Sequence, residues 1–313
     1  METKERQTSE TEADQQRHNP MILPADSGLY SFSNEHDACG VGLVANIHNT
    51  PSHAIVEMGV TVLKKLMHRG AAGWDPETGD GAGLLFSLPD AFLRRSVKFD
   101  LPKAGRYGVA MIFGGETEHA AIEAAVTAEG AAVLGWRKVP VHPEAIGRLA
   151  RETMPAISQL FIDGSSFEGP DAFERKLFLI RRRIEKTTKG TYVCSCSSRS
   201  IVYKGLLLAT QIDGFYPDLS AKDLVSPLVL VHQRYSTNTF PTWRLAHPFR
   251  YLAHNGEINT LRGNLNQLRA REPFLKSPNF TFDEMKTLLP LVDAGQSDSA
   301  SLDNMLELLV ASG

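Results

Sequence analysis

The apolar pattern of the chain begins abruptly at residue 39. Residues 1–38 carry eight acidic and three basic side chains and no apolar period, so little apolar burial can offset the entropy lost on ordering. From Cys39 the run CGVGLVANI is short, apolar and rich in small residues, which is typical of a strand buried on both faces. The pattern predicts a tail over residues 1–38 and a folded domain over residues 39–313.

A helical pattern follows this strand. Ser52 precedes it as an N-cap and Gly70 lies where it ends, which predicts a helix that runs to about Met67. The positions spaced for one buried face are Ile55, Met58, Val62, Leu66 and Met67. A glycine-rich turn, TGDGAG, then leads into a strand at residues 82–88. We interpret this turn as a tight bend that brings backbone close to Cys39, because it lacks the spacing of phosphate-binding loops and precedes a strand.

Strand and helix patterns alternate through the middle of the chain. Apolar runs predict strands at residues 106–113, 131–139 and 157–162, and helical periodicity predicts helices at residues 116–130 and 171–190. This alternation indicates sheets that are covered by helices. The strand count alone supports an α/β or α+β fold with more than one sheet.

The last third of the chain continues with strands and ends in a helix. β-Branched and aromatic residues alternate on both sides of residues 197–199, which predicts a hairpin over residues 191–205. Residues 227–236 and 250–256 are expected to be strands that end in polar residues, where sites commonly form. The final helix begins near Asp298 and still runs at residue 313, so we expect the domain to continue beyond the chain.

The composition is that of a soluble globular protein, with 42% apolar and 22% charged residues. A net charge of -3 gives no footprint for nucleic acid or an anionic membrane. No run approaches the roughly eighteen apolar residues of a spanning helix, and no signal-peptide core is present. We therefore expect a cytoplasmic protein. The three cysteines cannot form a disulfide framework or a four-thiolate metal site, which fits a reducing compartment.

Cys39 is the first candidate for chemistry. A thiolate is the reactive form of cysteine. If the chain were cut before Cys39, the new α-amine, with a pKa of about 7.7–8.0, would lie within reach of its own thiol and could act as the base. Residues 1–38 would then be a propeptide. The alternative is a buried structural cysteine, since free cysteine is among the most buried residue types.

Three other groups of residues have structural interpretations. Cys194 and Cys196 share one face of a predicted strand, where core packing is expected rather than metal binding. The basic run RRRIEK (181–186) is expected on a solvated helix face, with a docking surface as the second choice. Three histidines lack the helical spacing of a zinc motif, so no metal site is expected among them: His232, His247 and His254.

Five motifs occur in one order along the chain: CGVGL (39–43), LMHRGAAGWDPETGDGAGLL (66–85), HQRYSTNTFPTW (232–243), HNGEINTLRGN (254–264) and GQSDSASLDN (295–304). Together they closely resemble the type 2 glutamine amidotransferase domain at the N-terminus of glutamate synthase large chains. That family belongs to the N-terminal nucleophile hydrolases. The resemblance covers about residues 28–313. It implies an α+β fold, a four-layer αββα sandwich of two mainly antiparallel sheets between helical layers.

The resemblance also implies roles for individual residues. Cys39 matches the nucleophile, and Asn255 and Gly256 match the oxyanion hole, with a side-chain amide and a backbone N–H as donors. Arg234 matches the arginine that binds the α-carboxylate of glutamine, and Asp298 matches the acid that receives its α-ammonium. Further matching positions are Tyr235, Thr237 and Asn238, which line the family's substrate pocket, and Arg69, close to the nucleophile.

Several of these residues also have structural alternatives. Arg234 could form a strand-end ion pair of little energetic weight. The pair Asn255-Gly256 is a common tight-turn signal. Asp298 lies just before an apolar-periodic run, where a helix N-cap would lie.

The implied reaction is hydrolysis of L-glutamine to glutamate and ammonia through a cysteinyl thioester. In the full family enzyme the ammonia passes to a synthase domain with FMN and an iron–sulfur cluster, where 2-oxoglutarate is reductively aminated to glutamate. No cofactor or metal is expected in this chain itself. The expected partners are L-glutamine, a synthase domain of the same polypeptide, and a small electron-donating subunit or ferredoxin. Two alternatives stay open: an amidotransferase domain that serves another acceptor, and an inactive, truncated glutamine-binding module.

Overall fold

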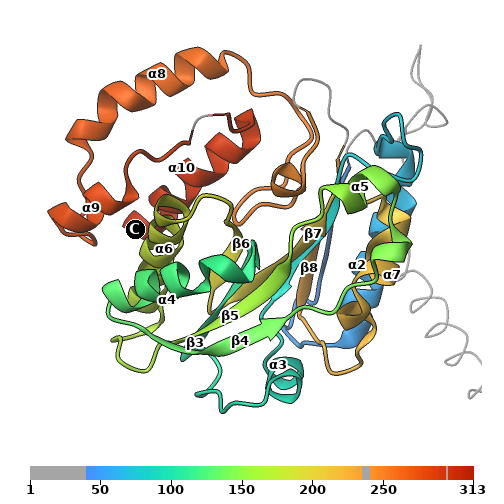
Figure 1. Cartoon of the computed structure of the whole chain (residues 1–313), viewed down its shortest axis with the longest axis horizontal. Helices are drawn as coiled ribbons and strands as arrows, with labels where there is room; N and C mark the ends of the chain where they lie inside the picture. Colours follow the sequence, from blue (N-terminus) through green and yellow to red (C-terminus); the bar gives the residue numbers. More distant parts are fainter. Residues whose placement is uncertain (1–39, 235–239, 294) are drawn as a thin grey trace, which may run out of the picture. The chain divides into compact units, whose positions relative to one another are not determined.

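The computed structural model of the chain describes residues 40–234, 240–293 and 295–313 (Figure 1). These residues belong to one compact unit. Within it, the strands form two four-stranded sheets in which all assigned neighbours pair antiparallel. The sequence predictions for the tail and for Cys39, Tyr235, Thr237 and Asn238 lie outside the described residues.

The first sheet has the strand order β1-β8-β2-β7. Its strands are β1 (Val41–Ala45), β8 (Leu228–Gln233), β2 (Ala82–Ser87) and β7 (Ser200–Gly205). The prediction that the first strand is buried on both faces is wrong, because β1 lies at the sheet edge, where Leu43 remains 65% exposed. The predicted strand at residues 82–88 is confirmed as β2, which is central and largely buried.

The second sheet has the order β4-β5-β3-β6. Its strands are β4 (Ala132–Lys138), β5 (Ile157–Asp163), β3 (Tyr107–Phe113) and β6 (Tyr192–Ser197). Every residue of β3 is buried. One reason is that β3 alternates its side chains between a core shared with the first sheet and a second core beneath helices. The apolar runs therefore predicted these strands well.

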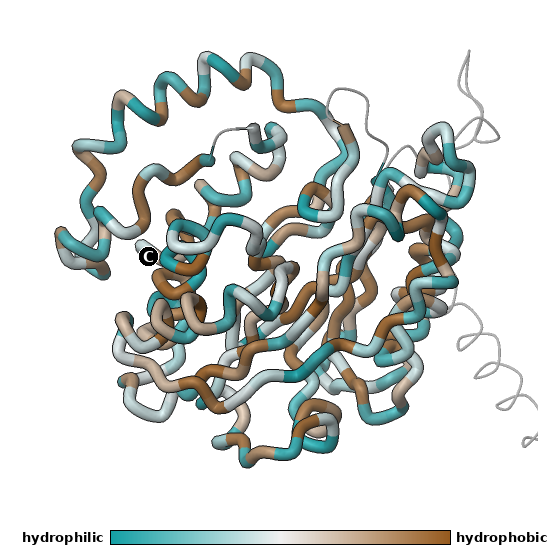
Figure 2. The backbone as a smooth tube through the Cα atoms, viewed as in Figure 1, coloured by the Kyte–Doolittle hydropathy of each residue, from teal (hydrophilic) through white to brown (hydrophobic). Residues whose placement is uncertain are grey.

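Helices cover the outer face of each sheet, which confirms the α+β fold and its four αββα layers. Helix α2 (His53–Lys65) packs on the first sheet, and α4 (His119–Ala128) and α6 (Pro170–Thr187) pack on the second (Figure 1). Apolar positions follow the strands and the inner faces of these helices (Figure 2). The remaining helices are α3 (Asp90–Ser96), α5 (Arg148–Glu152), α7 (Ile212–Phe215), α8 (Leu261–Arg271), α9 (Phe282–Leu288) and α10 (Asp298–Ser312).

Helix α2 begins as the sequence predicts but is turned about its axis. The Ser52 hydroxyl accepts a hydrogen bond from the Ile55 amide at 3.4 Å and caps the helix. The buried stripe is centred on Gly59, where an added Cβ would lie 2.6 Å from the Val229 side chain. Met58 and Met67, predicted to be buried, are consequently about half exposed, at 46% and 51%. The helix gives way at its end to a 3₁₀ turn, η3 (Leu66–Arg69).

The predicted hairpin over residues 191–205 is wrong. Its two strands form, but β6 belongs to the second sheet and β7 to the first. The two strands are linked by a hydrogen bond to a side chain: the Val202 amide of β7 donates to Ser195 Oγ of β6 at 3.2 Å. Residues 197–199 thus turn the chain from one sheet to the other, a packing choice that local alternation does not reveal.

A register shift in β6 also separates its two cysteines. The pairing of β6 with β3 shifts between Met111 and Ile112. As a result Cys194 packs in the core between the sheets, whereas Cys196 packs beneath α4 and α6. They do not share a face as predicted, although both are buried in the core as expected.

Residues 250–256 do not form the predicted strand. They run as a loop with bends, in which the Phe249 amide donates to the Leu252 carbonyl at 2.8 Å. The predicted final helix is confirmed as α10, which starts at Asp298. Across the described ranges, none of the helices combines the length and the apolar character needed to cross a membrane.

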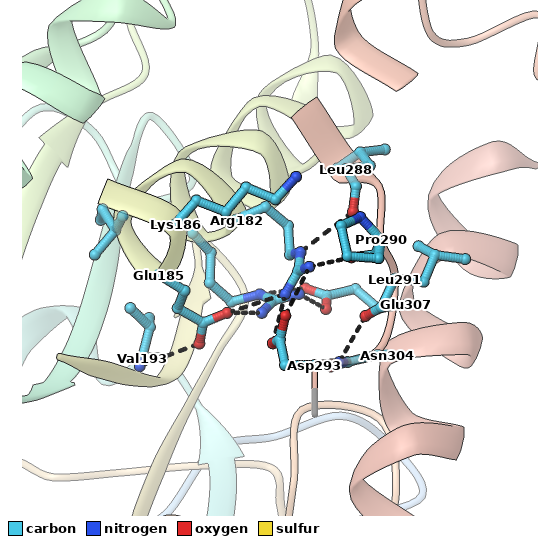
Figure 3. A network of polar contacts seen from close by, with 12 residues as sticks. Arg182, Glu185, Lys186, Val193, Leu288, Pro290, Leu291, Asp293, Asn304 and Glu307 are labelled. Atoms are coloured by element: carbon cyan, nitrogen blue, oxygen red, sulfur yellow. Dashed lines mark hydrogen bonds and ion pairs between the residues drawn. The ribbon is translucent and has the colours of Figure 1, made fainter. Parts of the chain in front are cut away.

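Two arginines of the basic run of α6 are buried, so the prediction of a solvated face is wrong for them, whereas Arg183 is partly exposed and Lys186 is exposed. Arg181 and Arg182 are each 1% exposed. Arg181 pairs with Glu307 of α10 and, at 2.6 Å, with Glu185. Arg182 Nη1 lies 3.1 Å from Asp293 Oδ2 (Figure 3). These charged side chains tie α6 to the C-terminal segment that carries Asp298.

Replacing Glu307 by Ala is expected to lower the free energy of unfolding by about 3–5 kcal/mol. Glu307 accepts from Arg181 and also from Arg250 Nε at 3.0 Å, so its loss leaves two buried guanidinium groups short of a partner. Urea unfolding measures the change. The control is Glu152→Ala, whose pair with Arg148 is more than half exposed on both sides and should cost at most about 0.5 kcal/mol. Equal losses in both variants would contradict this account of the network.

Candidate active site

Segments that are distant in sequence meet at one end of the first sheet. The Gln233 amide at the end of β8 donates to the Gly40 carbonyl at 2.7 Å. The next amide, that of Arg234, donates to the Gly81 carbonyl at 2.8 Å. The start of β1, the end of β8 and the glycine-rich turn before β2 are therefore held side by side.

Gly40 lies against the side chain of Asn255. A Cβ at residue 40 would lie 2.7 Å from Asn255 Nδ2 and 2.3 Å from the Gln233 carbonyl oxygen. Contacts this short leave room for a glycine alone. The amide predicted as an oxyanion donor thus lies over the backbone that directly follows Cys39.

The loop that carries Asn255 and Gly256 is fastened on both sides. Before Asn255, the His254 carbonyl oxygen lies 3.0 Å from His232 Nε2. After Gly256, the Ile258 amide donates to Asp298 Oδ2 at 2.7 Å. The two residues form no hairpin turn in the structure, so the tight-turn interpretation does not account for them.

Arg234 is buried and faces acidic groups. The residue is 6% exposed, which tells against an ion pair on the surface. Burial lowers the pKa of the guanidinium, while the charges of Asp80 and Asp298 act in the opposite direction. The group remains a cation at any physiological pH. The structure therefore places a buried positive charge near two carboxylates.

Asp298 is the first residue of α10 and holds two backbone amides. Its Oδ1 accepts from the Ser299 amide at 2.6 Å, and its Oδ2 accepts from Ile258. The N-cap is Ser297, whose hydroxyl accepts from the Ala300 amide at 3.2 Å, so the N-cap alternative for Asp298 is wrong. Oδ1 also accepts from the Ser299 hydroxyl at 3.3 Å, whereas Oδ2 keeps a second acceptor site, through which the side chain can still receive an ammonium group.

Arg69 comes from the end of η3, beside the same strand end. A Cβ at the next residue, Gly70, would lie 2.3 Å from Gln233 Nε2. The 3₁₀ turn is therefore packed directly against β8. Arg69, Arg234, Asn255, Gly256 and Asp298 are the predicted site residues within the described ranges, and all five lie on segments that border this end of the sheet.

The sequence analysis missed two buried side chains at the site. Asp80 is 7% exposed and its charge acts on Arg234. The signal in the sequence is an acidic residue inside the glycine-rich turn TGDGAG. Gln233 is 1% exposed and lies among Gly40, Gly70 and Gly81. It therefore packs between the three segments that carry these glycines.

The three histidines form no metal centre in the part of the chain that the structure describes, where no group of three or more His, Cys, Asp or Glu could hold an ion. The rings of His232 and His247 instead stack, with centroids 4.4 Å apart and planes at 22°. Burial lowers the pKa of His232 to about 4 and that of His247 well below its ordinary value. Both rings are therefore neutral at physiological pH.

Comparison with known proteins confirms the resemblance found in the sequence. The glutamate synthase [NADPH] large chain of Bacillus subtilis (strain 168) is 48% identical over 303 residues, which cover 93% of this chain and 20% of that protein. The corresponding large chain of Azospirillum brasilense is 42% identical over 301 residues, or 92% and 20% of the two chains. The ferredoxin-dependent glutamate synthase, chloroplastic, of Oryza sativa subsp. japonica is 44% identical over 300 residues, or 91% and 18%.

The chain spans about a fifth of the length of these relatives. A family model for glutamine amidotransferases class-II matches residues 39–313. That match begins at Cys39 and takes in every segment of the site described above. The chain therefore belongs to the class-II glutamine amidotransferases.

Proposed function

We propose that this chain hydrolyses L-glutamine to glutamate and ammonia, with Cys39 as the nucleophile. One observation carries the proposal. The Asn255 amide lies over Gly40, the residue next to Cys39, at the strand end where buried Arg234 faces Asp298. A donor for an oxyanion and opposite charges for the two ends of an amino acid thus lie around the residue that follows Cys39 in the chain.

Arg234 binds the α-carboxylate of glutamine in this proposal. A planar guanidinium donates two parallel hydrogen bonds to a carboxylate. Its burial strengthens the pairing, because water competes little there. Asp298 receives the α-ammonium, and Arg69, Tyr235, Thr237 and Asn238 complete the pocket.

The reaction follows from these positions. The Cys39 thiolate attacks the side-chain carbonyl carbon of glutamine, and the oxygen becomes an oxyanion that the Asn255 amide and the Gly256 N–H stabilise. The carbon–nitrogen bond then breaks, and the departing nitrogen takes a proton from the Cys39 α-ammonium and leaves as ammonia. Water attacks the γ-glutamyl thioester, which releases glutamate and restores the thiol. This sequence requires that hydrolysis of the bond before Cys39 removes residues 1–38.

We further propose that the domain serves a glutamate synthase. The relatives compared above carry that name and are about five times as long. Ammonia would pass to a synthase part with FMN and an iron–sulfur cluster, and the electron donor would be a nicotinamide nucleotide, through a small subunit, or ferredoxin. The relatives' names include both NADPH and ferredoxin. The cytoplasmic location stays a prediction, as does the division into a propeptide and an amidotransferase domain.

Replacing Arg234 by Ala is expected to raise KM for glutamine by roughly ten- to a hundredfold with little change in kcat. The lost contact is a charge-assisted hydrogen bond of about 1.5–3 kcal/mol to a group that does not react. Steady-state ammonia release measures both constants. Arg148→Ala, at a position 56% exposed, is the matched control and should leave both unchanged. An unaltered KM in the Arg234 variant would remove this residue from the substrate site.

A further inference from the structure

The hydrogen bonds of His232 determine which of its ring nitrogens carries the proton. Nε2 lies 3.0 Å from the His254 carbonyl oxygen, which can only accept. Nε2 must therefore donate. Because the ring is 1% exposed and neutral, Nδ1 has no hydrogen and presents a lone pair.

The Asn255 side chain lies close to the His232 ring, whose Nε2 contacts the carbonyl of the preceding residue, His254. Hydrogen bonding to the Asn255 side chain raises the pKa of His232, as an acceptor that faces the ring does, and His232 is paired across the sheet with Val41, the neighbour of Gly40. Two buried atoms here lack a hydrogen-bond partner among the described residues: His232 Nδ1 and Asn255 Oδ1. Both are acceptors. An amide has nearly the same shape after a half-turn about its last bond, so the partner decides which end faces it.

We propose that His232 is a positioning residue whose Nδ1 accepts one N–H of the Asn255 amide. This bond satisfies the buried lone pair and fixes the orientation of the amide. In the proposed function, its second N–H is the oxyanion donor. That last clause rests on the proposed glutaminase function, whereas the bond between the two side chains does not.

A second ring holds His232 in place. His247 stacks on it, and His247 Nε2 lies 3.2 Å from the Ser299 hydroxyl, one residue after Asp298. The two rings therefore connect the loop that carries Asn255 and Gly256 to the start of α10. The charged or titratable groups that act on them are Arg234, Lys204 and His254. Their cationic forms disfavour protonation of the rings and so preserve the Nδ1 lone pair.

The kinetic test uses a variant that keeps one nitrogen function and removes the other. His232→Gln retains a donor toward the His254 carbonyl but has no acceptor at the Nδ1 position. It should lower kcat roughly ten- to a hundredfold, less than the loss of a whole oxyanion donor, with KM within about twofold. His142→Gln, at an exposed position, is the control and should change neither constant. An unchanged kcat in a folded His232→Gln protein would overturn the proposal.

A double-mutant cycle shows whether His232 acts through Asn255. In an Asn255→Ala background, His232→Gln should have little further effect on kcat, because the group that it positions is gone. A merely structural role would give the same loss in both backgrounds, and that result would overturn the proposal.

Nitrogen NMR of histidine-labelled protein tests the bond without any assay. His232 should show a protonated Nε2 and an unprotonated, hydrogen-bonded Nδ1 whose signal moves in Asn255→Ala. A protonated Nδ1, or a signal that does not respond to Asn255→Ala, would refute the assignment. If the parent protein has no glutaminase activity, the proposed function fails while this spectrum still decides the hydrogen bond.

Discussion

Replacing Cys39 by Ala is expected to abolish glutamine hydrolysis. The variant lacks the sulfur that forms the thioester, and losing the nucleophile of an acyl-enzyme mechanism costs on the order of 10⁶ in kcat. Cys39→Ser should also be severely impaired, because a hydroxyl is far less acidic than a thiol and the α-amine is a weak base. Ammonia release, with circular dichroism to verify folding, measures the effect.

The chain offers a matched control for this substitution. Cys196 is buried beneath α4 and α6, away from the site. Cys196→Ala removes the same atoms and should lower stability but not kcat. If Cys39→Ala released ammonia at the rate of the parent, Cys39 would not be the nucleophile.

Replacing Asn255 by Ala is the second large expected effect. The variant loses one of two oxyanion donors, so kcat should fall by about 10²–10³, or about 2.7–4 kcal/mol of barrier. KM should change little, because this donor acts on charge that develops only in the transition state. Steady-state kinetics on glutamine separate the two constants.

Asn264→Ala makes the same chemical change at an exposed position of α8 and should leave kcat as in the parent. The test depends on whether kcat or KM changes in Asn255→Ala. A rise in KM with kcat unaltered in Asn255→Ala would mean that the amide binds ground-state glutamine and stabilises no oxyanion.

Local patterns predicted most elements because those elements bury one face against a sheet. The strands β2, β3, β4 and β5 and the helices α4, α6 and α10 lie close to their predicted ranges. The spacing of apolar residues indicates which positions are buried, and burial determines the secondary structure of these segments. In β1, at the sheet edge, and in α2, beside Gly59, packing against a neighbouring element determines which side is buried. There the apolar pattern predicted the element correctly but not its buried face.

The failures share a cause, which is that the deciding partner is remote in sequence. Arg181 and Arg182 are charged, and their burial depends on Glu307 and Asp293, more than 100 residues away. The strands β6 and β7 alternate as a hairpin would, but each pairs with a different sheet. No local rule contains that information.

The candidate site could be predicted only in part. Arg234, Asn255 and Asp298 can each be explained singly by an ordinary structural role. Only the order of the motifs assigns all three to one glutamine-binding site. The structure adds that Arg234 is buried near Asp298 and that Asn255 contacts Gly40. Asp80 and the Nδ1 of His232 were not predicted, because their importance lies in what they face and not in their residue type.

The central claim is that the Cys39 thiol is acylated by glutamine at this strand end, with the α-amine of the same N-terminal residue as the base. A diazoketone analogue of glutamine, which alkylates the nucleophile of such sites, tests it by intact and peptide mass spectrometry. The account predicts a chain that begins at Cys39 and carries a single adduct on the Cys39 sulfur. An adduct on Cys194, Cys196 or any other side chain, with Cys39 unmodified, would contradict it.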